Sequence, residues 1–300
     1  MNIDVGRVGI WSPSPRWEQS PELADAAAEL EELGYGALWL GSSRGDLELP
    51  GVLLQSTRRI VVATAIINIW TNPADELAAR YASLQGRAPD RLLVGLGSSH
   101  APLVEPAGFS YRQPLRRLAG YLDELDASVP TIPAERRILA ALGPRALELA
   151  AARSAGAHPY LVTPEYTRQA RAALGSGPLL AVEQKLVLET EPARAREIAR
   201  ARLAQYLELP NYTNSFLRQG FSTDDFGHGG SDRLVDALIG WGDTEALLER
   251  IAAHHAAGAD HVAIQVLDSS DPNAPHAGAL PRTTWRQLAG AGQWAPAGAR

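Results

Sequence analysis

The sequence contains no cysteine among its 300 residues. This absence excludes disulfide frameworks, thiolate nucleophiles and cysteine-ligated zinc or iron–sulfur sites. The chain also has no excess of positive charge, since 28 arginines and lysines face 34 acidic residues and the formal net charge is -6. A chain of this charge has little means of neutralising a phosphate backbone, so we expect no nucleic-acid partner.

Lysine is almost absent as well, because Lys185 is the only one in the chain. One lysine makes a Schiff-base mechanism improbable and excludes a lysine-rich patch that binds a membrane surface. The longest apolar run, residues 60–70, is interrupted by Thr64 and Asn68, and the first residues do not have the pattern of an export signal. We therefore expect a cytoplasmic protein that has no membrane partner.

The sequence does contain a regular alternation of short apolar runs and amphipathic segments. Its 45% hydrophobic and 21% charged residues are typical of a globular protein with a substantial core. The alternation predicts eight strands, at residues 8–11, 37–40, 60–67, 92–96, 137–142, 158–162, 179–188 and 261–267.

Helix start and stop signals separate these runs. A capping residue precedes proline at Ser20, Asn72 and Thr163, and a glycine ends each of the segments that follow. Residues 243–257 form a further predicted helix, which ends at Gly258 just before the last strand.

Strand–helix units in this number, with strands too apolar to have a wet face, favour a closed (β/α)8 TIM barrel of the α/β class over an open sheet. We predict one barrel domain over residues 1–300. Residues 207–239 do not fit the repeat, and we interpret them as an insertion or lid between the seventh and eighth strands. Residues 269–278 are predicted to be a polar, turn-rich segment before a final short helix.

In such a barrel the reaction takes place where strands end and loops begin. A metal-dependent hydrolase would need a His-x-His pair near the first strand, but the first histidine is His100. Glycoside hydrolysis needs two carboxylates at facing strand ends, and only Glu165 and Asp268 are available there. We therefore predict no metal site and do not favour a glycosidase.

Gly143, Pro144 and Arg145 follow one predicted strand and open a predicted helix. Free N–H groups and the positive end of the helix would face the barrel mouth there, and Thr163 at the next strand end could add a hydroxyl. These residues form either a phosphate-binding site or ordinary helix N-termini, since Gly-Pro and Thr-Pro are common at helix starts.

The segment RLLVGLGSSH, residues 91–100, runs from a strand into a Gly-x-Gly pair, Gly95 and Gly97. The pair indicates either a tight turn or the close approach of something flat to the strand end. His100 directly follows this strand end and is the best proton-handling candidate of the chain, so we predict that it is catalytic.

The remaining histidines and tryptophans have other expected places. We expect His158 and His261 to pack in the core, and His254 to lie on a helix whose outer face is wet. Trp11 and Trp70 end strands and could wall an aromatic ligand, although burial without function is the simpler interpretation of each.

Five segments of the sequence, taken in order and spacing, carry a family resemblance: residues 33–43 (LGYGALWLGSS), 60–84 (IVVATAIINIWTNPADELAARYASL), 86–100 (GRAPDRLLVGLGSSH), 142–167 (LGPRALELAAARSAGAHPYLVTPEYT) and 257–267 (AGADHVAIQVL). They cover nearly the whole chain. Together they resemble the luciferase-like flavin monooxygenase superfamily, and within it the deazaflavin (coenzyme F420)-dependent oxidoreductases of actinobacterial type.

The resemblance implies a barrel with an insertion near the seventh strand, a flavin or deazaflavin ring across the mouth, and hydride transfer at that ring. It implies a non-prolyl cis peptide in the third strand, at Ala65–Ile66. Where several deazaflavin enzymes carry an Asp-His pair this sequence has Ser42 and Ser43, and some have a glutamate where His100 stands. The implied cofactor-binding residues are Ser42, Ala65, Ile66, Gly97, Ser98, Gly143, Pro144, Arg145 and Thr163.

Three functions follow from these observations. The first is an F420-dependent oxidoreductase that transfers a hydride to or from a small organic substrate, with His100 as proton donor or acceptor. The second is an FMN-dependent monooxygenase on the same fold. The third is a barrel that binds a flavin or deazaflavin without turnover, which the serines at the Asp-His position suggest. The family also suggests a homodimer.

Overall fold

The computed structural model describes residues 3–268, 279–292 and 294, so the predicted polar segment at residues 269–278 lies outside the described residues. Nine strands form one parallel sheet. In chain order they are β1 (Val8–Pro13), β2 (Ala37–Ser43), β3 (Val61–Asn68), β4 (Leu92–Gly97), β5 (Arg137–Leu139), β6 (Gly156–Ala157), β7 (Leu179–Leu188), β8 (Ile239–Gly242) and β9 (His261–Leu267).

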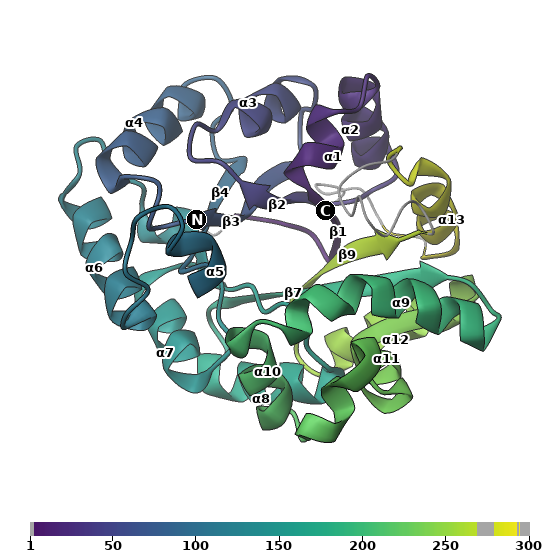
Figure 1. Ribbon diagram of the computed structural model, residues 1–300. Coiled ribbons are helices and arrows are strands. Elements are labelled where there is room, and N and C mark those ends of the chain that lie inside the picture. The colour runs from purple at the N-terminus through teal and green to yellow at the C-terminus, as the bar shows by residue number, and fades with distance from the viewer. Residues whose placement is uncertain (1–2, 269–278, 293, 295–300) are drawn as a thin grey trace.

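Eight of the nine strands close into a barrel (Figure 1). Strands β1 to β6 are neighbours in chain order, β6 pairs with the first residues of β7, and β9 lies between β7 and β1. Strand β8 pairs with the last residues of β7, where Lys185 lies opposite Ile239. The predicted (β/α)8 barrel is therefore confirmed, with β8 as an additional strand that the sequence pattern did not predict.

Helices surround the barrel (Figure 1), and none in the described part of the chain is both long and apolar enough to cross a membrane. They are α1 (Ser14–Glu18), α2 (Leu23–Glu32), α3 (Glu48–Gln55), α4 (Ala74–Gln85), α5 (Ala101–Val104), α6 (Pro114–Ala127), α7 (Pro144–Arg153), α8 (Pro164–Leu174), α9 (Pro192–Leu207), α10 (Pro210–Arg218), α11 (Asp232–Leu238), α12 (Thr244–Ala256) and α13 (Arg282–Gly292), with 3-10 turns η1 (Ala134–Arg136) and η2 (Thr223–Gly229).

Two of the four predicted helix starts are correct, at Thr163 and at residue 243, where Asp243 caps α12. The hydroxyl of Thr163 accepts a hydrogen bond from the N–H of Tyr166 at 3.1 Å and caps α8 as expected.

At Asn72 the start is displaced: the side chain accepts the N–H of Gly45, and α4 begins at Ala74 after Pro73. The start predicted at Ser20 is wrong. Its hydroxyl accepts the N–H of Glu22 in a turn, and α2 begins only at Leu23.

The sixth strand was predicted at residues 158–162, and this position is wrong. The strand is β6, which ends just before them. Pro159 has no N–H to donate to a ladder, and Leu161 adopts a φ of 55°, which turns the chain out of the sheet. Residues 158–162 therefore form the loop between β6 and α8, at the carboxyl end of the barrel.

The chain between β7 and β9 forms a group of elements beside the barrel: α9, α10, η2, α11, β8 and α12. Apolar side chains from α9, α10, α11 and β8 pack together around Leu203 and Phe216, in a cluster separate from the main core. The predicted insertion or lid over residues 207–239 stays a prediction. In Figure 1 its helices α10 and α11 lie in front of the lower part of the barrel.

The inside of the barrel is filled by two tryptophans among small residues. Trp39 is fully buried, and Trp11 lies over Gly41, where a Cβ atom would come within 2.2 Å of the indole. The alanines of this inner cluster are Ala37, Ala63, Ala181 and Ala263. Small residues around large rings give a filled barrel without overpacking.

Two histidines complete this inner core, as predicted. Nε2 of His261 accepts a hydrogen bond from the indole N–H of Trp39 at 2.8 Å, and its Nδ1–H donates to the carbonyl of Gly6 at 2.9 Å. The ring of His158 stacks on Trp39 with centroids 4.5 Å apart. Because both nitrogens of His261 are bonded in the neutral form, a proton on this ring would break a hydrogen bond.

The wet position predicted for His254 is wrong. This side chain is fully buried, and its ring lies 2.8 Å from the hydroxyl of Thr167 and 2.7 Å from Oε1 of Gln184. Helix α12 turns this face toward β7 rather than toward water. The histidine therefore joins α8, α12 and β7 through hydrogen bonds.

Acid should destabilise the fold through these histidines. Burial lowers the pKa of His158 to about 4, and those of His254 and His261 to about 3, from the ordinary 6.5. The unfolded chain therefore binds protons that the native rings do not take up, and the free energy of unfolding falls as the pH drops below 6.5. We expect about 1.4 kcal/mol per pH unit for each ring.

Urea unfolding between pH 7.5 and pH 5 measures this slope, and His254→Gln should reduce it. His228→Asn is the matched control, because His228 is exposed and its φ of 54° suits asparagine. A slope that is the same in His254→Gln and the parent would contradict the assignment.

Candidate functional site

Strand β3 carries an irregularity close to its carboxyl end. Its register with β4 shifts between Ala63 and Ile67. The peptide bond between Ala65 and Ile66 is cis, as the resemblance implied. Both residues are half-buried, although they lie in the interior of a barrel strand. The bulge is therefore accessible from the barrel mouth.

The Gly-x-Gly pair of β4 makes room for this bulge. The hydroxyl of Thr64 accepts the N–H of Gly95 at 2.7 Å and donates to its carbonyl at 3.0 Å. A Cβ on Gly95 would lie 1.9 Å from the carbonyl oxygen of Thr64, and one on Gly97 would lie 2.9 Å from Ile66 and 3.1 Å from Ala140. The close approach expected at these glycines exists, and the group that approaches is strand β3.

Three hydrogen bonds hold the loop after β4 in place. The indole N–H of Trp70 donates to the carbonyl of Ser98 at 2.9 Å. The carbonyl of Ser99 accepts from the hydroxyl of Tyr111 at 2.9 Å and from Nδ2 of Asn211 at 3.2 Å. Ser99 has a φ of 55°, so the chain turns here. The loop is thus tied to the chain after β3, to its own continuation and to α10.

His100 follows this loop and begins helix α5. Its ring centroid lies 5.3 Å from that of Tyr212 on α10, and its Nδ1 is buried without a hydrogen-bond partner in the described part of the chain. Burial lowers the pKa of this histidine below 6.5. The imidazole is therefore neutral at pH 7 and can accept a proton at the free nitrogen.

Helix α7 begins at the carboxyl end of β5, as predicted, with Gly143 as its N-cap. A sequence-distant cation lies beside it: Nη2 of Arg218, from α10, donates to the carbonyl of Leu142 at 2.8 Å and lies 3.8 Å from where a Cβ on Gly143 would be. Pro144 and Arg145 are exposed. Sequence reasoning missed Arg218, because nothing local connects it with α7.

Thr163 is less available than the sequence suggested. Its hydroxyl caps α8, and its N–H donates to Oε1 of Gln219 at 2.9 Å. Ser42 is exposed, and the register of β2 with β3 places it beside Ile66. One arc of the mouth therefore brings together most of the predicted residues, in the order Ser42, Ala65, Ile66, Gly97, Ser98, Gly143, Pro144 and Arg145.

A buried ion pair lies inside the barrel, and sequence reasoning missed it. Nζ of Lys185 is 3.0 Å from Oε1 of Glu183 and 3.6 Å from the ring centroid of Tyr160. Burial lowers the pKa of Lys185 to about 8, against the attraction of Glu183, and burial raises the pKa of Glu183. The signal was present, since two charged residues at i and i+2 of an apolar strand point to the same face.

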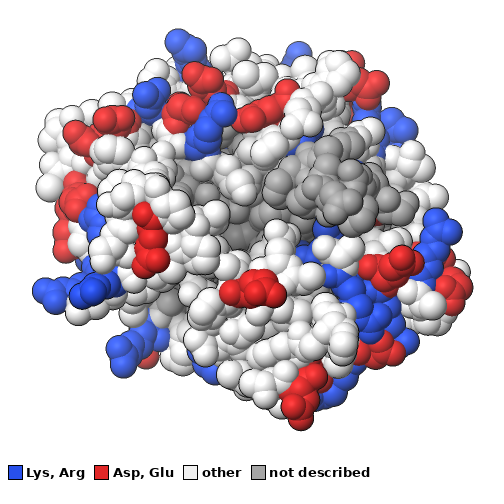
Figure 2. Space-filling model, in the orientation of Figure 1, with Lys and Arg blue, Asp and Glu red and all other residues white. Residues whose placement is uncertain are grey.

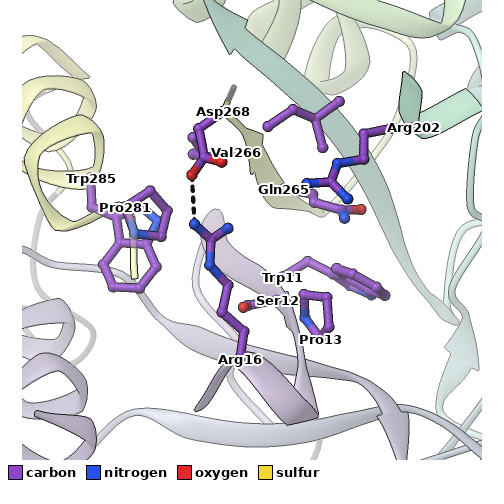
Figure 3. A pocket seen from close by; sticks show the side chains of 11 residues that line it. Trp11, Ser12, Pro13, Arg16, Arg202, Gln265, Val266, Asp268, Pro281 and Trp285 are labelled. Carbon is purple, nitrogen blue, oxygen red and sulfur yellow. Dashed lines mark hydrogen bonds and ion pairs between the residues drawn. The ribbon is translucent and has the colours of Figure 1, made fainter. Parts of the chain in front are cut away.

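The mouth is hollowed at its centre, and most charged side chains on this face lie around its circumference (Figure 2). Between β1 and β9 a small cavity of about 10 Å³ has room for one water. Figure 3 shows Arg16 reaching across this cavity to Asp268, with their charged atoms 2.5 Å apart. Trp11 and Gln265 line its other side.

Comparison with known proteins assigns the family. The model of the family described as luciferase-like monooxygenase matches residues 6–261. The chain belongs to the luciferase-like monooxygenase family. No curated protein matches it.

Solved structures similar to this luciferase-like chain include the coenzyme F420-dependent tetrahydromethanopterin reductase from Methanopyrus kandleri, at 14% identity and a TM-score of 0.72 over 95% of this chain and 97% of the other. An F420-dependent secondary alcohol dehydrogenase in complex with an F420-acetone adduct has 14% identity and a TM-score of 0.69, over 90% and 96%.

The oxygenating constituent of 3,6-diketocamphane monooxygenase from the CAM plasmid of Pseudomonas putida, in complex with FMN, has 12% identity and a TM-score of 0.64, over 95% and 96%. At identities this low, the TM-scores show a shared fold alone.

The packing of Gly97 against the bulge can be tested directly. Gly97→Ala should lower the free energy of unfolding by about 1–3 kcal/mol, because the new methyl group would contact Ile66 and Ala140 too closely. In an Ile66→Ala background the loss should be smaller. Urea unfolding measures both.

Gly120→Ala is the matched control, since a Cβ at this position on α6 would have no atom of another described element within 4 Å. It should be neutral or stabilising by up to about 1 kcal/mol. An equal loss for Gly97→Ala in both backgrounds would contradict the packing role.

Proposed function

We propose that the protein is an oxidoreductase that binds coenzyme F420 at the barrel mouth and transfers a hydride between the deazaflavin and a small organic substrate. The observation that carries this proposal is the half-buried bulge at Ala65 and Ile66, which lies on one arc with a helix start flanked by arginine. The bound deazaflavin would supply the hydride chemistry, and the protein supplies position, electrostatics and a proton.

The apolar end of this arc suits a flat ring. The side chains of Ile66 and Ala140 both lie close to Gly97, so β3, β4 and the chain after β5 meet here. None of these residues is charged, and the bulge is open to the mouth. A planar, mostly apolar ring would bury its face here in place of water.

The polar end suits a phosphate. The N–H groups at the start of α7 have no partner within the helix, and the helix end carries positive charge. Arg218 lies against Gly143, and Arg145 is exposed in the first turn. Arg218, Gly143 and Arg145 would hold the phosphate, whereas the N–H of Thr163 is already bonded to Gln219.

His100 would accept and return the proton of the substrate hydroxyl. Its unpartnered Nδ1 can take a proton from a substrate hydroxyl when the substrate is oxidised, and can return it in the reverse direction. The two F420-dependent relatives, with TM-scores of 0.72 and 0.69, support a deazaflavin. The relative in complex with FMN, at 0.64, supports the alternative, an FMN-dependent monooxygenase.

Fluorescence titration of the purified protein with F420 and with FMN tests the cofactor. We expect F420 to bind at micromolar concentrations and FMN to bind at least tenfold more weakly. Absence of F420 binding would overturn the proposal, and preferential FMN binding with oxygen-dependent oxidation of reduced FMN would support the monooxygenase. Tight F420 binding with no acceptor in a broad substrate screen would instead support a binding protein without turnover.

Arg218→Gln tests the phosphate-binding site. The variant should bind F420 about tenfold more weakly, the change expected for loss of a charge-assisted hydrogen bond. It should not alter binding of the deazaflavin chromophore that lacks the phosphate. Arg168→Gln is the matched control, because this arginine pairs with Glu165 on the outer helix α8. Equal weakening of both ligands by Arg218→Gln would contradict a phosphate contact.

His100→Gln tests the proton role. Because burial lowers the pKa of His100, the neutral base is lost only as the pH falls below 6.5, so kcat for substrate oxidation should decline there in the parent protein. His100→Gln should lower kcat about 100-fold and remove this decline, as expected for loss of a general base. A variant that keeps the parent pH profile would show that another group carries the proton.

A further inference from the structure

Five aromatic rings pack in a continuous row beside the mouth; Tyr160 and Tyr206 are half-buried, whereas Trp11, Tyr212 and Phe216 are buried. We define the aromatic wall as Trp11, Tyr160, Tyr206, Tyr212 and Phe216. Ring centroids lie 5.2 Å apart for Trp11 and Tyr160, 5.5 Å for Tyr160 and Tyr206, and 4.9 Å for Tyr206 and Tyr212. These spacings are those of packed aromatic pairs. The wall joins β1, the loop after β6, α9 and α10.

The wall contains one polar spot. The hydroxyl of Tyr160 donates to Oε1 of Gln265 at 2.9 Å and lies 2.8 Å from the hydroxyl of Tyr206. Tyr160 has one hydroxyl hydrogen, so Tyr206 is the donor in the second bond and keeps a free lone pair. Nε2 of Gln265 donates to no other described residue. The spot therefore offers an unused donor and an unused acceptor.

The ring of Tyr160 is held in position from below. The ammonium of Lys185 lies 3.6 Å from its centroid, and Glu183 pairs with that ammonium. In register, Lys185 lies opposite Gln265, so the cation and the amide stand on adjacent strands at one level of the barrel. A spot whose ring and hydroxyl are both fixed loses little entropy when a ligand binds.

One of the two arginines beside this spot, Arg16, is paired with a carboxylate of the protein. Arg16 pairs with Asp268 (Figure 3). Its guanidinium also donates to the carbonyl of Ala279. Arg202 also lines this side of the mouth, and its side chain is not free. Tyr160, Tyr206 and Gln265 are half-buried, whereas these arginines are buried. A ligand at the spot thus meets rings and amide groups before it meets charge.

We propose that the aromatic wall binds the substrate, and that the substrate is an uncharged, flat molecule with one carbonyl or hydroxyl oxygen. The flat body would pack on Tyr160 and Tyr206. Its oxygen would accept from Nε2 of Gln265 or, as a hydroxyl, donate to Tyr206. Tyr212 continues the wall to His100, so the bound molecule would lie beside the proton acceptor. This inference rests on the proposed function, in taking the mouth as the reaction site.

Calorimetric titration of the full chain with a matched trio of probes tests the substrate class: 1-indanone, indane and indane-1-carboxylate. We expect 1-indanone to bind and the carboxylate to bind at least tenfold more weakly. Gln265→Leu should lower the affinity for 1-indanone about tenfold, the change expected for one hydrogen bond, and should change the affinity for indane by less than about twofold. Tyr160→Phe, which keeps the ring but frees the amide, should show the same selectivity with a smaller effect.

Tyr166→Phe is the control, because its hydroxyl is buried on α8 and has no hydrogen-bond partner among the described residues. This variant should bind 1-indanone and indane with the affinities of the parent protein. Stronger binding of the carboxylate, equal effects of Gln265→Leu on 1-indanone and indane, or no binding of 1-indanone would overturn the inference.

The F420 titration separates the two proposals. Binding of 1-indanone without any cofactor binding would remove the proposed function and leave the aromatic wall as a ligand site. Cofactor binding without selective 1-indanone binding would remove only the wall.

Discussion

The two hydrogen bonds between the hydroxyl of Thr64 and the backbone of Gly95 are the constraint on which the mouth depends. Where β3 bulges, its own peptide groups no longer meet those of β4 in register, and the threonine side chain supplies the missing donor and acceptor. Gly95 permits this contact only because it has no Cβ atom. The half-buried surface at Ala65 and Ile66 exists because this repair keeps the sheet closed behind it.

The rest of the arc is arranged around that bulge. Ile66 and Ala140 both lie beside Gly97, so the bulge and the chain leading to α7 meet at this glycine. The loop after β4 is then tied by Trp70 and Asn211, so His100 is held at the rim. The ring surface, the helix start and the proton acceptor thus belong to one packed unit rather than to three independent loops.

Local signals made much of the fold predictable. Alternating apolar runs gave the closed barrel, and β7 occupies the predicted residues 179–188. Thr163 caps α8 because its short polar side chain bonds the backbone three residues on. The family resemblance placed the cis peptide and predicted cofactor contacts, which remain predictions. The arc shows that Ser42, Gly97 and the start of α7 share one side of the mouth.

Contacts between distant segments were not predictable in this way. Arg218 at the end of α10 and Gln219 directly after it bond Leu142 and Thr163, just before α7 and α8, and no sequence spacing encodes that approach. His254 was placed in water because a helix does not reveal which of its faces meets a strand. The sixth strand was misplaced because β-branched and aromatic residues favour a strand locally, whereas Pro159 ends it.

The burial of Lys185 has a practical consequence. The only side-chain amine of the protein is sealed inside the barrel, under Tyr160 and against Glu183. Acylating reagents that label lysines on other proteins will find no such group on the surface of this one. Labelling at this residue would therefore report opening of the barrel, so the chain carries a built-in probe of its own unfolding.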